Sequence, residues 1–303
     1  MTSLARLLIK NLFKIGSLGT SEITELFVNA EILWRRTAGD GSSAIGPHIF
    51  VEALMSNPDT HIERAFISAA SRLNVSFRCV PVGEDLWRTL EVASRYANLL
   101  VVRHPYLDSV DRASQLRCPI ISAGGGKESP LRALTDLYVL ARSWEGGLEA
   151  IASKTFVFTG NVWRNEEVRS FLTLLALYRP KQVAIVPLPG YPDSSEIVSL
   201  LAHPPTALVM GNDLSPELLA EADVVFFAGR PMSPEPDRRF DRFQINNQNL
   251  APLRTGTVVM GDDCRIFMGM AGDRPEFDYD VLRFEQRFVS IMMAVIEGSL
   301  RQY

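Results

Sequence analysis

Strand-like and helix-like stretches alternate along almost the whole of this 303-residue chain. Such alternation favours parallel sheets with helices on both faces, and it predicts an α/β fold. The expected strands cover 48–54, 76–82, 98–104, 119–123, 154–160, 181–189, 207–211, 223–229 and 256–261. The expected helices cover 60–73, 84–97, 130–142, 166–178, 194–202 and 281–298.

A charged, glycine-containing segment at 142–154 divides the alternation into two series. We expect two Rossmann-like domains of three layers each, with parallel sheets and an interdomain cleft. The first domain would cover 1–145 and be closed by the C-terminal helix 281–303, and the second would cover 146–280. Ligands of such folds bind at the carboxyl ends of the strands, so we expect the site in the cleft.

Composition excludes several classes of function. The net charge of -4 argues against a nucleic-acid partner. Cys79, Cys118 and Cys264 are too far apart for a metal-ligand pair or a disulfide framework, which favours a cytoplasmic protein. The apolar stretches are too short to cross a membrane. Over residues 1–18 we expect an amphipathic helix on the protein body, because lysines interrupt the apolar run of a signal peptide.

Two loops that follow expected strands have the composition of small-anion sites. Arg-His-Pro at 103–105 ends one strand, and a glycine-rich loop with a lysine at 124–129 follows the next. This loop lacks the lysine–serine spacing of a P-loop, and 159–165 has one glycine where a dinucleotide fingerprint has three. We therefore expect no cofactor. The acidic residues do not have metal-ligand spacing, so we expect no metal.

Arg-His-Pro is followed by Ala-Gly-x-Gly at 123–126 and by Leu-x-Asp-Leu at 134–137. This order resembles the aspartate/ornithine carbamoyltransferases. Further similar stretches cover 83–105, 154–171, 222–235 and 283–298, so the resemblance spans nearly the whole chain. It implies a carbamoyl-phosphate-binding-like first domain, an amino-acid-binding-like second domain, and a homotrimer with sites at its subunit interfaces.

Carbamoyl transfer develops negative charge on the donor, and family members surround the donor with cations. The family's Ser-Thr-Arg-Thr-Arg motif falls here on 59–63, where one threonine remains and two acids have entered. Its His-Pro-x-x-Gln falls on 129–132, and its mobile loop is missing between Phe77 and Gly83. Its acceptor-binding arginine falls on Glu166. The resemblance therefore implies a donor site that has lost several cations.

The residues that remain could still hold a small anion and an amino-acid-like ligand. We predict Arg103, Thr60 and Arg132 as catalytic residues, and His104, Lys127, Ser129, Arg164 and Arg230 as substrate-binding residues. Alternatively, Arg103 and His104 only satisfy backbone carbonyls, the glycine loop is a plain turn, and His61 is inert at an exposed helix start.

Two hypotheses follow from these losses and retentions. The first is a transferase with altered chemistry that acts on a small amino-acid-like substrate without the standard carbamoyl phosphate mechanism. The second is a catalytically inactive homologue that serves as a scaffold or regulatory subunit beside a paralogous subunit. Retention of Arg103 and the glycine loop favours the first, and the acids in the donor motif favour the second.

Overall fold

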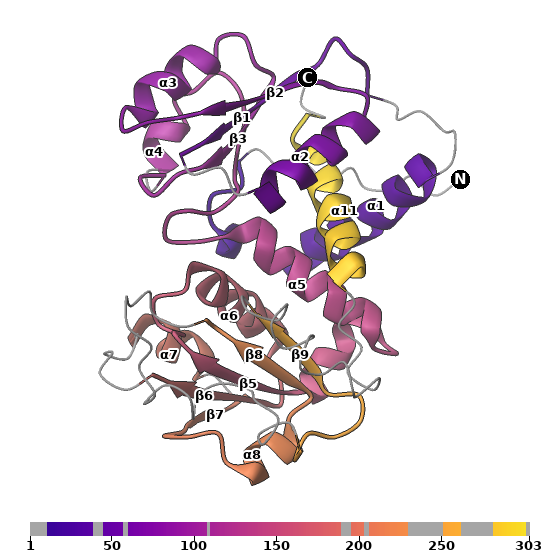
Figure 1. Ribbon diagram of the computed structural model, residues 1–303, viewed down its shortest axis with the longest axis vertical. Helices are drawn as coiled ribbons and strands as arrows, with labels where there is room; N and C mark the ends of the chain where they lie inside the picture. Colours follow the sequence, from indigo (N-terminus) through magenta and orange to yellow (C-terminus); the bar gives the residue numbers. More distant parts are fainter. Residues whose placement is uncertain are drawn as a thin grey trace. The chain divides into compact units, whose positions relative to one another are not determined.

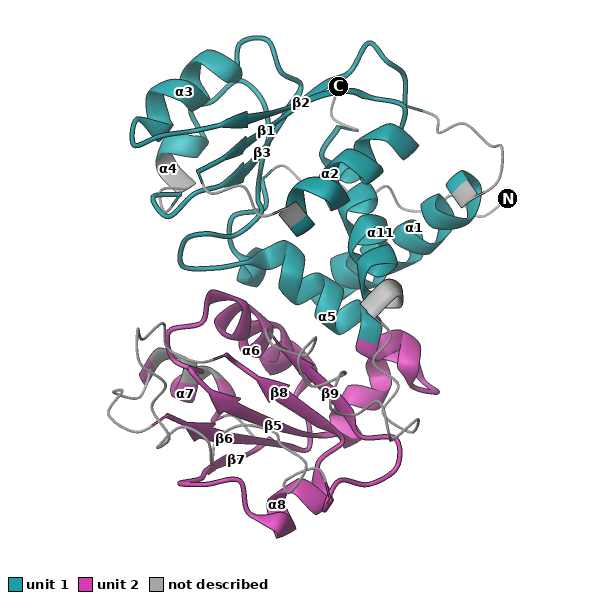
Figure 2. Cartoon of the chain, viewed as in Figure 1, with its two compact units in different colours: residues 1–139, 284–303 teal, residues 140–283 magenta. Residues whose placement is uncertain are grey.

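The computed structural model describes residues 11–38, 45–56, 60–107, 110–188, 195–202, 206–229, 251–261 and 281–300. The chain divides into two compact units (Figure 2). Unit 1 comprises 1–139 and 284–303, and unit 2 comprises 140–283. The expected boundary at 145–146 stays a prediction.

Unit 1 contains a parallel sheet with the strand order β2-β1-β3-β4 (Figure 1). Its strands are β1 (Phe50–Met55), β2 (Ser76–Pro81), β3 (Leu99–Arg103) and β4 (Ile120–Ser122). Its helices are α1 (Thr20–Ala38), α2 (Thr60–Arg72), α3 (Leu86–Ala93), α4 (Val110–Ala113), most of α5 (Pro130–Ser143) and most of α11 (Val281–Leu300), with the 3-10 turn η1 (Ile15–Ser17).

Helices cover both faces of the unit 1 sheet. On one face, Leu86 and Leu90 of α3 share a buried cluster with Leu100 of β3. On the other face, Phe66 of α2 packs edge-on against Phe77 of β2, with ring centroids 5.9 Å apart. Because side chains alternate between the faces of a strand, these two contacts define the three layers of the unit.

A polar network joins α1, α5 and α11 within unit 1. The hydroxyl of buried Tyr138 donates to Glu31 Oε2 at 3.0 Å, and Arg287 Nη1 donates to the same oxygen at 3.3 Å. The Arg287 guanidinium also lies over the Tyr138 ring, 5.5 Å from its centroid. Further along, Asn29 Nδ2 donates to Glu297 Oε2 at 2.6 Å. These contacts fix the C-terminal helix on helices from the start and the middle of the chain.

Unit 2 contains a second parallel sheet with the order β7-β6-β5-β8-β9. Its strands are β5 (Thr155–Gly160), β6 (Gln182–Pro187), β7 (Ala207–Met210), β8 (Val224–Phe227) and β9 (Val258–Gly261). Its helices are α6 (Glu166–Tyr178), α7 (Ser195–Leu201) and α8 (Pro216–Glu221), with the 3-10 segment η2 (Gly147–Ser153). Phe158, Phe171 and Phe226 pack together in its core at centroid distances of 5.5 to 6.0 Å.

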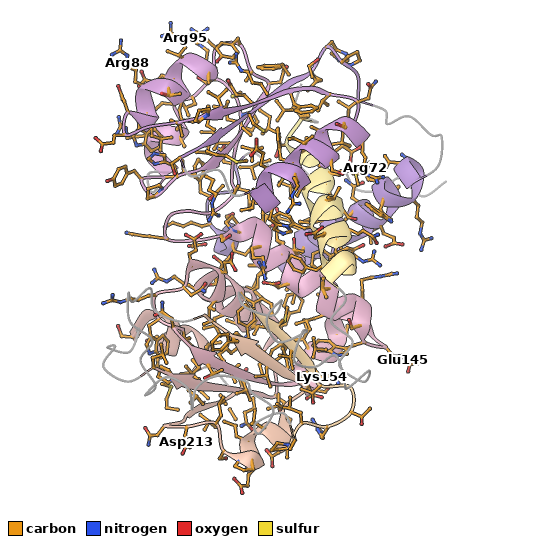
Figure 3. All side chains as sticks on the ribbon, viewed as in Figure 1. Arg72, Arg88, Arg95, Glu145, Lys154 and Asp213 are labelled. Atoms are coloured by element: carbon orange, nitrogen blue, oxygen red, sulfur yellow. The ribbon has the colours of Figure 1, made fainter. Side chains whose placement is uncertain are left out.

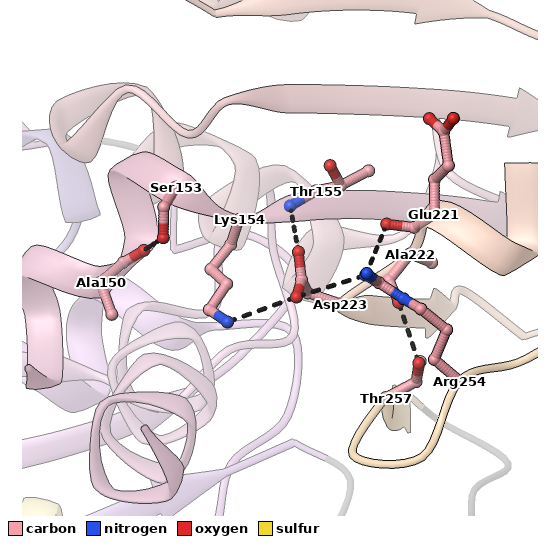
Figure 4. Close-up of polar contacts among 9 residues, drawn as sticks. All are labelled: Ala150, Ser153, Lys154, Thr155, Glu221, Ala222, Asp223, Arg254 and Thr257. Atoms are coloured by element: carbon pink, nitrogen blue, oxygen red, sulfur yellow. Dashed lines mark hydrogen bonds and ion pairs between the residues drawn. The ribbon is translucent and has the colours of Figure 1, made fainter. Parts of the chain in front are cut away.

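The amino ends of β5 and β8 are held together by Asp223 (Figure 4). Its Oδ2 accepts from the buried backbone N–H of Thr155 at 2.8 Å, and its Oδ1 lies 3.3 Å from Lys154 Nζ and 3.5 Å from Arg254 Nη2. Arg254 also donates to the carbonyl of Glu221 at 2.9 Å. One half-buried carboxylate on the segment before β8 thus joins the start of β5 and the segment before β9.

The α/β fold with two parallel sheets is confirmed, and every expected strand overlaps an observed one. The N-terminal prediction was wrong over residues 11–18, because Leu12 forms a parallel bridge with Ile121 and only a 3-10 turn follows. Residues 1–10 lie outside the described part. Helix α1 was missed, although Ile23, Leu26 and Ala30 have helical spacing and are fully buried. Among the described residues, none of the helices combines the length and apolarity needed to span a membrane.

We expect Asp223→Ala to weaken the start of β5, because the buried Thr155 N–H loses its acceptor. The expected loss is about 1–3 kcal/mol in the free energy of unfolding. Hydrogen–deuterium exchange should show faster exchange at the start of β5. Asp213→Ala, which removes an exposed carboxylate of the same unit (Figure 3), is the matched control. Equal exchange in the two variants would contradict this role of Asp223.

Candidate functional site

In unit 1 the strand order reverses between β1 and β3. The chain runs from β1 through α2 to β2 on one side, and then through α3 to β3 on the other. Loops on opposite sides of such a point leave a crevice at the carboxyl ends of the strands. Here the loops after β1 and β3 are joined, since Ser56 N and Ser56 Oγ donate to the carbonyl of Arg103 at 3.0 and 3.3 Å.

The loop after β4 joins the same edge of the sheet. The N–H of His104 donates to the carbonyl of Gly124 at 3.1 Å, and the N–H of Ala123 donates to the carbonyl of Val102 at 2.8 Å. Arg103 is half-buried at the end of β3, and its Nη1 donates to the carbonyl of Ala123 at 3.2 Å. The predicted Arg-His-Pro and glycine-rich loops therefore form one substructure.

Close backbone contact explains the glycines of this loop. Gly124 and Gly125 have φ of 93° and 92°, in the region that side chains disfavour. A Cβ on Gly125 would stand 3.0 Å from the backbone N of His104 and 3.2 Å from Cγ of Arg103. The loop is thus more than a turn, because it sets the position of the arginine next to it.

His104 is 2% exposed, and both of its ring nitrogens contact the backbone. Nδ1 accepts from the N–H of Tyr106 at 3.1 Å, so the proton of a neutral ring belongs on Nε2, which donates to the carbonyl of Gly83 at 3.1 Å. These bonds favour the structural interpretation of His104. Its predicted role in substrate binding has no support in this geometry.

Arg132 lies in the first turn of α5 and is held from two sides. Its Nε is 3.2 and 3.3 Å from the two carboxylate oxygens of Asp136, which is fully buried. Its guanidinium also lies over the ring of Phe284 from α11, 4.5 Å from the centroid. A nearby carboxylate reduces the attraction of this guanidinium for any further anion.

The other predicted residues of unit 1 lie around the starts of α2 and α5. Ser129 is buried just before α5, where its carbonyl accepts from the N–H of Ala133 at 3.1 Å, and Lys127 is exposed in the glycine loop. Thr60 is the first residue of α2, and its side chain lies outside the described part. The roles predicted for these residues stay predictions.

His61, at a position where the family has arginine, is not an exposed side chain. Its ring stacks on Phe288 with centroids 5.4 Å apart and planes at 12°. Its Nδ1 lies 3.4 Å from Glu285 Oε1. Both partners belong to α11, so this histidine joins α2 to the C-terminal helix.

The two cysteines of unit 1 are poor nucleophiles. Burial, with a smaller contribution from the charge of Glu52, raises the pKa of Cys118 to about 12. Burial, together with the charge of Glu63, raises the pKa of Cys79 to about 11. Both thiols therefore stay protonated at neutral pH, and neither supplies a thiolate.

In unit 2 the strand order reverses between β5 and β8, and the loops after these strands meet. The N–H of Asn161 donates to the carbonyl of Gly229 at 3.1 Å, and Asn165 Nδ2 donates to the carbonyl of Ala228 at 3.1 Å. Asn165 Oδ1 also caps α6 by accepting from the N–H groups of Glu167 and Val168 at 2.8 and 3.1 Å. In a sheet of this topology, this edge is where a ligand is expected to bind.

Several polar atoms are buried near this edge without a hydrogen-bond partner among the described residues, including Trp163 Nε1, Asn161 Oδ1 and Arg169 Nε. Such atoms cost free energy unless a ligand or water satisfies them. Arg164 is exposed in the same loop, whereas Arg230 lies outside the described residues.

Comparison with known proteins identifies a family that matches this chain. The family model of the aspartate/ornithine carbamoyltransferase carbamoyl-P binding domain matches residues 10–142. The aspartate carbamoyltransferase catalytic subunit of Sulfurisphaera tokodaii is 26% identical over 72% of this chain and 73% of its own. This chain belongs to the aspartate/ornithine carbamoyltransferase superfamily.

Further relatives extend the likeness to the whole fold. The multifunctional protein pyr-3 of Neurospora crassa is 27% identical over 68% of this chain, and the match spans 12% of that much longer protein. Aspartate transcarbamoylase from Trypanosoma cruzi in complex with phosphate has the same fold, with a TM-score of 0.82, 20% identity and 97% of each chain covered. The superfamily fold thus covers both units.

Sequence reasoning missed the partners of Arg132 and His61. Asp136 could have been found, because it follows Arg132 by four residues on one helix. Phe284 and Glu285 come from α11, far along the chain from both Arg132 and His61, and no local pattern connects them to these residues.

We expect Gly125→Ala to displace Arg103 and to destabilise unit 1. The positive φ alone costs about 1–2 kcal/mol, and the close contact with His104 adds to it. Gly256→Ala is the matched control, since Gly256 also has a positive φ of 87° but nothing within 4 Å of an added Cβ. Thermal and chemical denaturation should show the larger loss for Gly125→Ala. Equal losses would contradict the contact.

Arg103 and Arg132 should respond differently to the same substitution. Arg132→Gln leaves the buried Asp136 without this charge and should cost about 3 kcal/mol of folding stability. Arg103→Gln should cost less stability, because the bond it removes between Arg103 and Ala123 goes to a neutral carbonyl, whereas that of Arg132 goes to a buried carboxylate. Denaturant titration measures both, with Arg88→Gln on the exposed face of α3 as control. The reverse ranking would contradict the structural role of Arg132.

Proposed function

We propose that this chain is a transferase that uses Arg103 to bind a small anionic donor and acts on an amino-acid-like acceptor with chemistry altered from standard carbamoyl phosphate transfer. The observation that carries the proposal is the position of Arg103. It lies at the reversal point of the unit 1 sheet, beside a glycine loop whose backbone conformation leaves room for it. Catalysis by family members depends on cations held in such a position.

The charges around the donor region, at the starts of α2 and α5, favour altered chemistry. Arg132 is paired with buried Asp136, and His61 lies beside Glu285. Neither residue offers the uncompensated charge that two arginines would supply to a phosphate. Each charged hydrogen bond lost costs about 1.5–3 kcal/mol, so losing several would slow a donor-dependent reaction by several powers of ten.

Unit 2 supports an amino-acid-like acceptor. Its reversal point combines the buried Trp163 N–H, the exposed Arg164 and the start of α6. A guanidinium and N–H donors suit a carboxylate, and Asn161 Oδ1 suits an ammonium group. Glu166, at the position where the family has an acceptor-binding arginine, disfavours the second carboxylate of aspartate.

The second candidate function is a catalytically inactive scaffold or regulatory subunit. It is favoured by the structural bonds of His104 and Arg132, which both serve the fold of unit 1. Under this proposal the fold is retained for assembly with a paralogous subunit. The expectations of a homotrimer and of a cytoplasmic location stay predictions under either function.

The test measures donor binding and product formation separately. Calorimetric titration with carbamoyl phosphate and with inorganic phosphate should show binding that Arg103→Gln weakens at least about tenfold, the effect of losing one charged bond. Radiolabelled carbamoyl phosphate should then be offered to a panel of amino acids. We expect carbamoyl aspartate to form slowly or not at all.

Three outcomes decide between the proposals. Fast aspartate carbamoylation would show that the standard chemistry persists and would overturn altered chemistry. Binding that Arg103→Gln leaves unchanged, as Arg88→Gln should, would overturn the role of Arg103. Absence of binding by every anion tested would overturn the transferase and favour the scaffold, for which recovery of a paralogous subunit in a pull-down is the next measurement.

A further inference from the structure

The N-terminal segment, residues 11–15, is bonded to β4, the strand that leads into the glycine loop. The N–H of Leu12 donates to the carbonyl of Ile120 at 2.9 Å, and the carbonyl of Leu12 accepts from the N–H of Ser122 at 2.8 Å. Asn11 Oδ1 also accepts from the N–H of Ile120 at 2.9 Å. Because Ser122 is the last residue of β4, these bonds fix the chain just before the glycine loop begins.

The same segment also holds the other end of the glycine loop. Glu128 is the last residue but one of this loop, and its Oε2 accepts from the backbone N–H of Ile15 at 2.8 Å. Ile15 is fully buried at the start of η1. A carboxylate that accepts from a backbone N–H forms a charge-assisted hydrogen bond, which is stronger than a bond between neutral groups.

Between its two ends the glycine loop packs on the Arg-His-Pro segment. A Cβ on Gly126 would stand 3.4 Å from the carbonyl oxygen of His104 and 3.6 Å from that of Leu107, next to the closer contact of Gly125. The glycine loop thus has two supports, the segment 103–107 at its glycines and the N-terminal segment at its ends. Loss of the second support would let the last residues of the loop move.

The charge of Glu128 and its hydrogen bond have opposite effects on an anion site. A carboxylate repels an anionic ligand nearby, so the charge by itself weakens binding. The bond to Ile15 holds in place the residues on either side, exposed Lys127 and buried Ser129 at the start of α5, so the bond favours binding. The two effects can be separated by substitution.

We propose that Glu128 is a positioning residue of the anion site, which holds the glycine loop on the N-terminal segment and thereby sets the positions of Lys127 and Ser129 relative to Arg103. This proposal rests on the proposed function, because it takes Arg103 and the glycine loop as the donor site. Glu128 acts through the loop and not by contact with the donor. The N–H of Ile15 is the other half of the contact.

Two substitutions of Glu128 separate its charge from its bond. Glu128→Gln keeps an oxygen acceptor for the N–H of Ile15, whereas Glu128→Ala removes both the charge and the acceptor. In calorimetric titration with inorganic phosphate and carbamoyl phosphate, Glu128→Ala should bind at least about threefold more weakly than the parent protein, because part of the energy of the lost bond reaches the ligand. Glu128→Gln should bind at least as tightly as the parent protein, because a repelling charge is gone.

A substitution of Ile15 breaks the same contact from the other side. Ile15→Pro removes the N–H at the first residue of a helical turn, where proline is tolerated, and Lys14 before it has φ of -124° and ψ of 136°, the extended conformation that suits a following proline. Ile15→Ala shortens the same buried side chain and keeps the N–H. Ile15→Pro should bind phosphate at least about threefold more weakly than Ile15→Ala. Added to Glu128→Ala, it should weaken binding no further, because the two residues share one contact.

Hydrogen–deuterium exchange follows the glycine loop without any ligand. Exchange over 123–128 should be faster in Glu128→Ala than in Glu128→Gln, and faster in Ile15→Pro than in Ile15→Ala. Glu22→Ala is the matched control, because Glu22 Oε2 accepts from the backbone N–H of Gly19 at 2.7 Å, a bond of the same kind outside the glycine loop. This control should change neither the affinity for phosphate nor the exchange of the loop. The thermal midpoint shows that each variant is folded.

Three results would overturn the proposal, and each has a different meaning. If Glu128→Ala keeps or increases the affinity while Arg103→Gln lowers it, Glu128 does not position the site and the proposed function stands. Equal affinities of Ile15→Pro and Ile15→Ala would show that the N–H of Ile15 does not support the site. If the parent protein binds neither phosphate nor carbamoyl phosphate, the proposed function itself fails, and the role of Glu128 in anion binding fails with it.

Discussion

The close approach of Gly125 to the backbone of His104 is the constraint on which the unit 1 site depends. A side chain at this position would stand 3.0 Å from the His104 nitrogen, and the backbone has a φ that favours glycine. Because the loop can lie this close, the carbonyl of Gly124 accepts from His104 and the carbonyl of Ala123 accepts from Arg103. The position of the arginine is therefore set by the backbone geometry of the loop that follows the neighbouring strand β4.

Both units place polar groups by the same topological rule. In each parallel sheet the strand order reverses once, and the loops on either side of the reversal bond to each other, at Ser56 and Arg103 in unit 1 and at Asn161 and Gly229 in unit 2. The opposite edge of the unit 2 sheet contributes to the stability of the fold. There Asp223 binds backbone and cations and serves stability, because it lies at the amino ends of the strands.

Electrostatic compensation limits the donor region of unit 1. Around the starts of α2 and α5, Arg132 and His61 each lie beside a carboxylate, so their charges mainly hold helices together. Attraction for an anion depends on this local balance of charge more than on the number of arginines.

The sequence by itself determined the two parallel sheets, because buried strands and amphipathic helices have periods that are visible in a single chain. It also identified Arg-His-Pro and the glycine loop as one candidate site. Only the tertiary structure decided which cations remain available for a ligand. The partners of Arg132 and His61 on α11, and of Arg72 on α1, come from helices distant in sequence, and contacts between distant helices leave no local pattern.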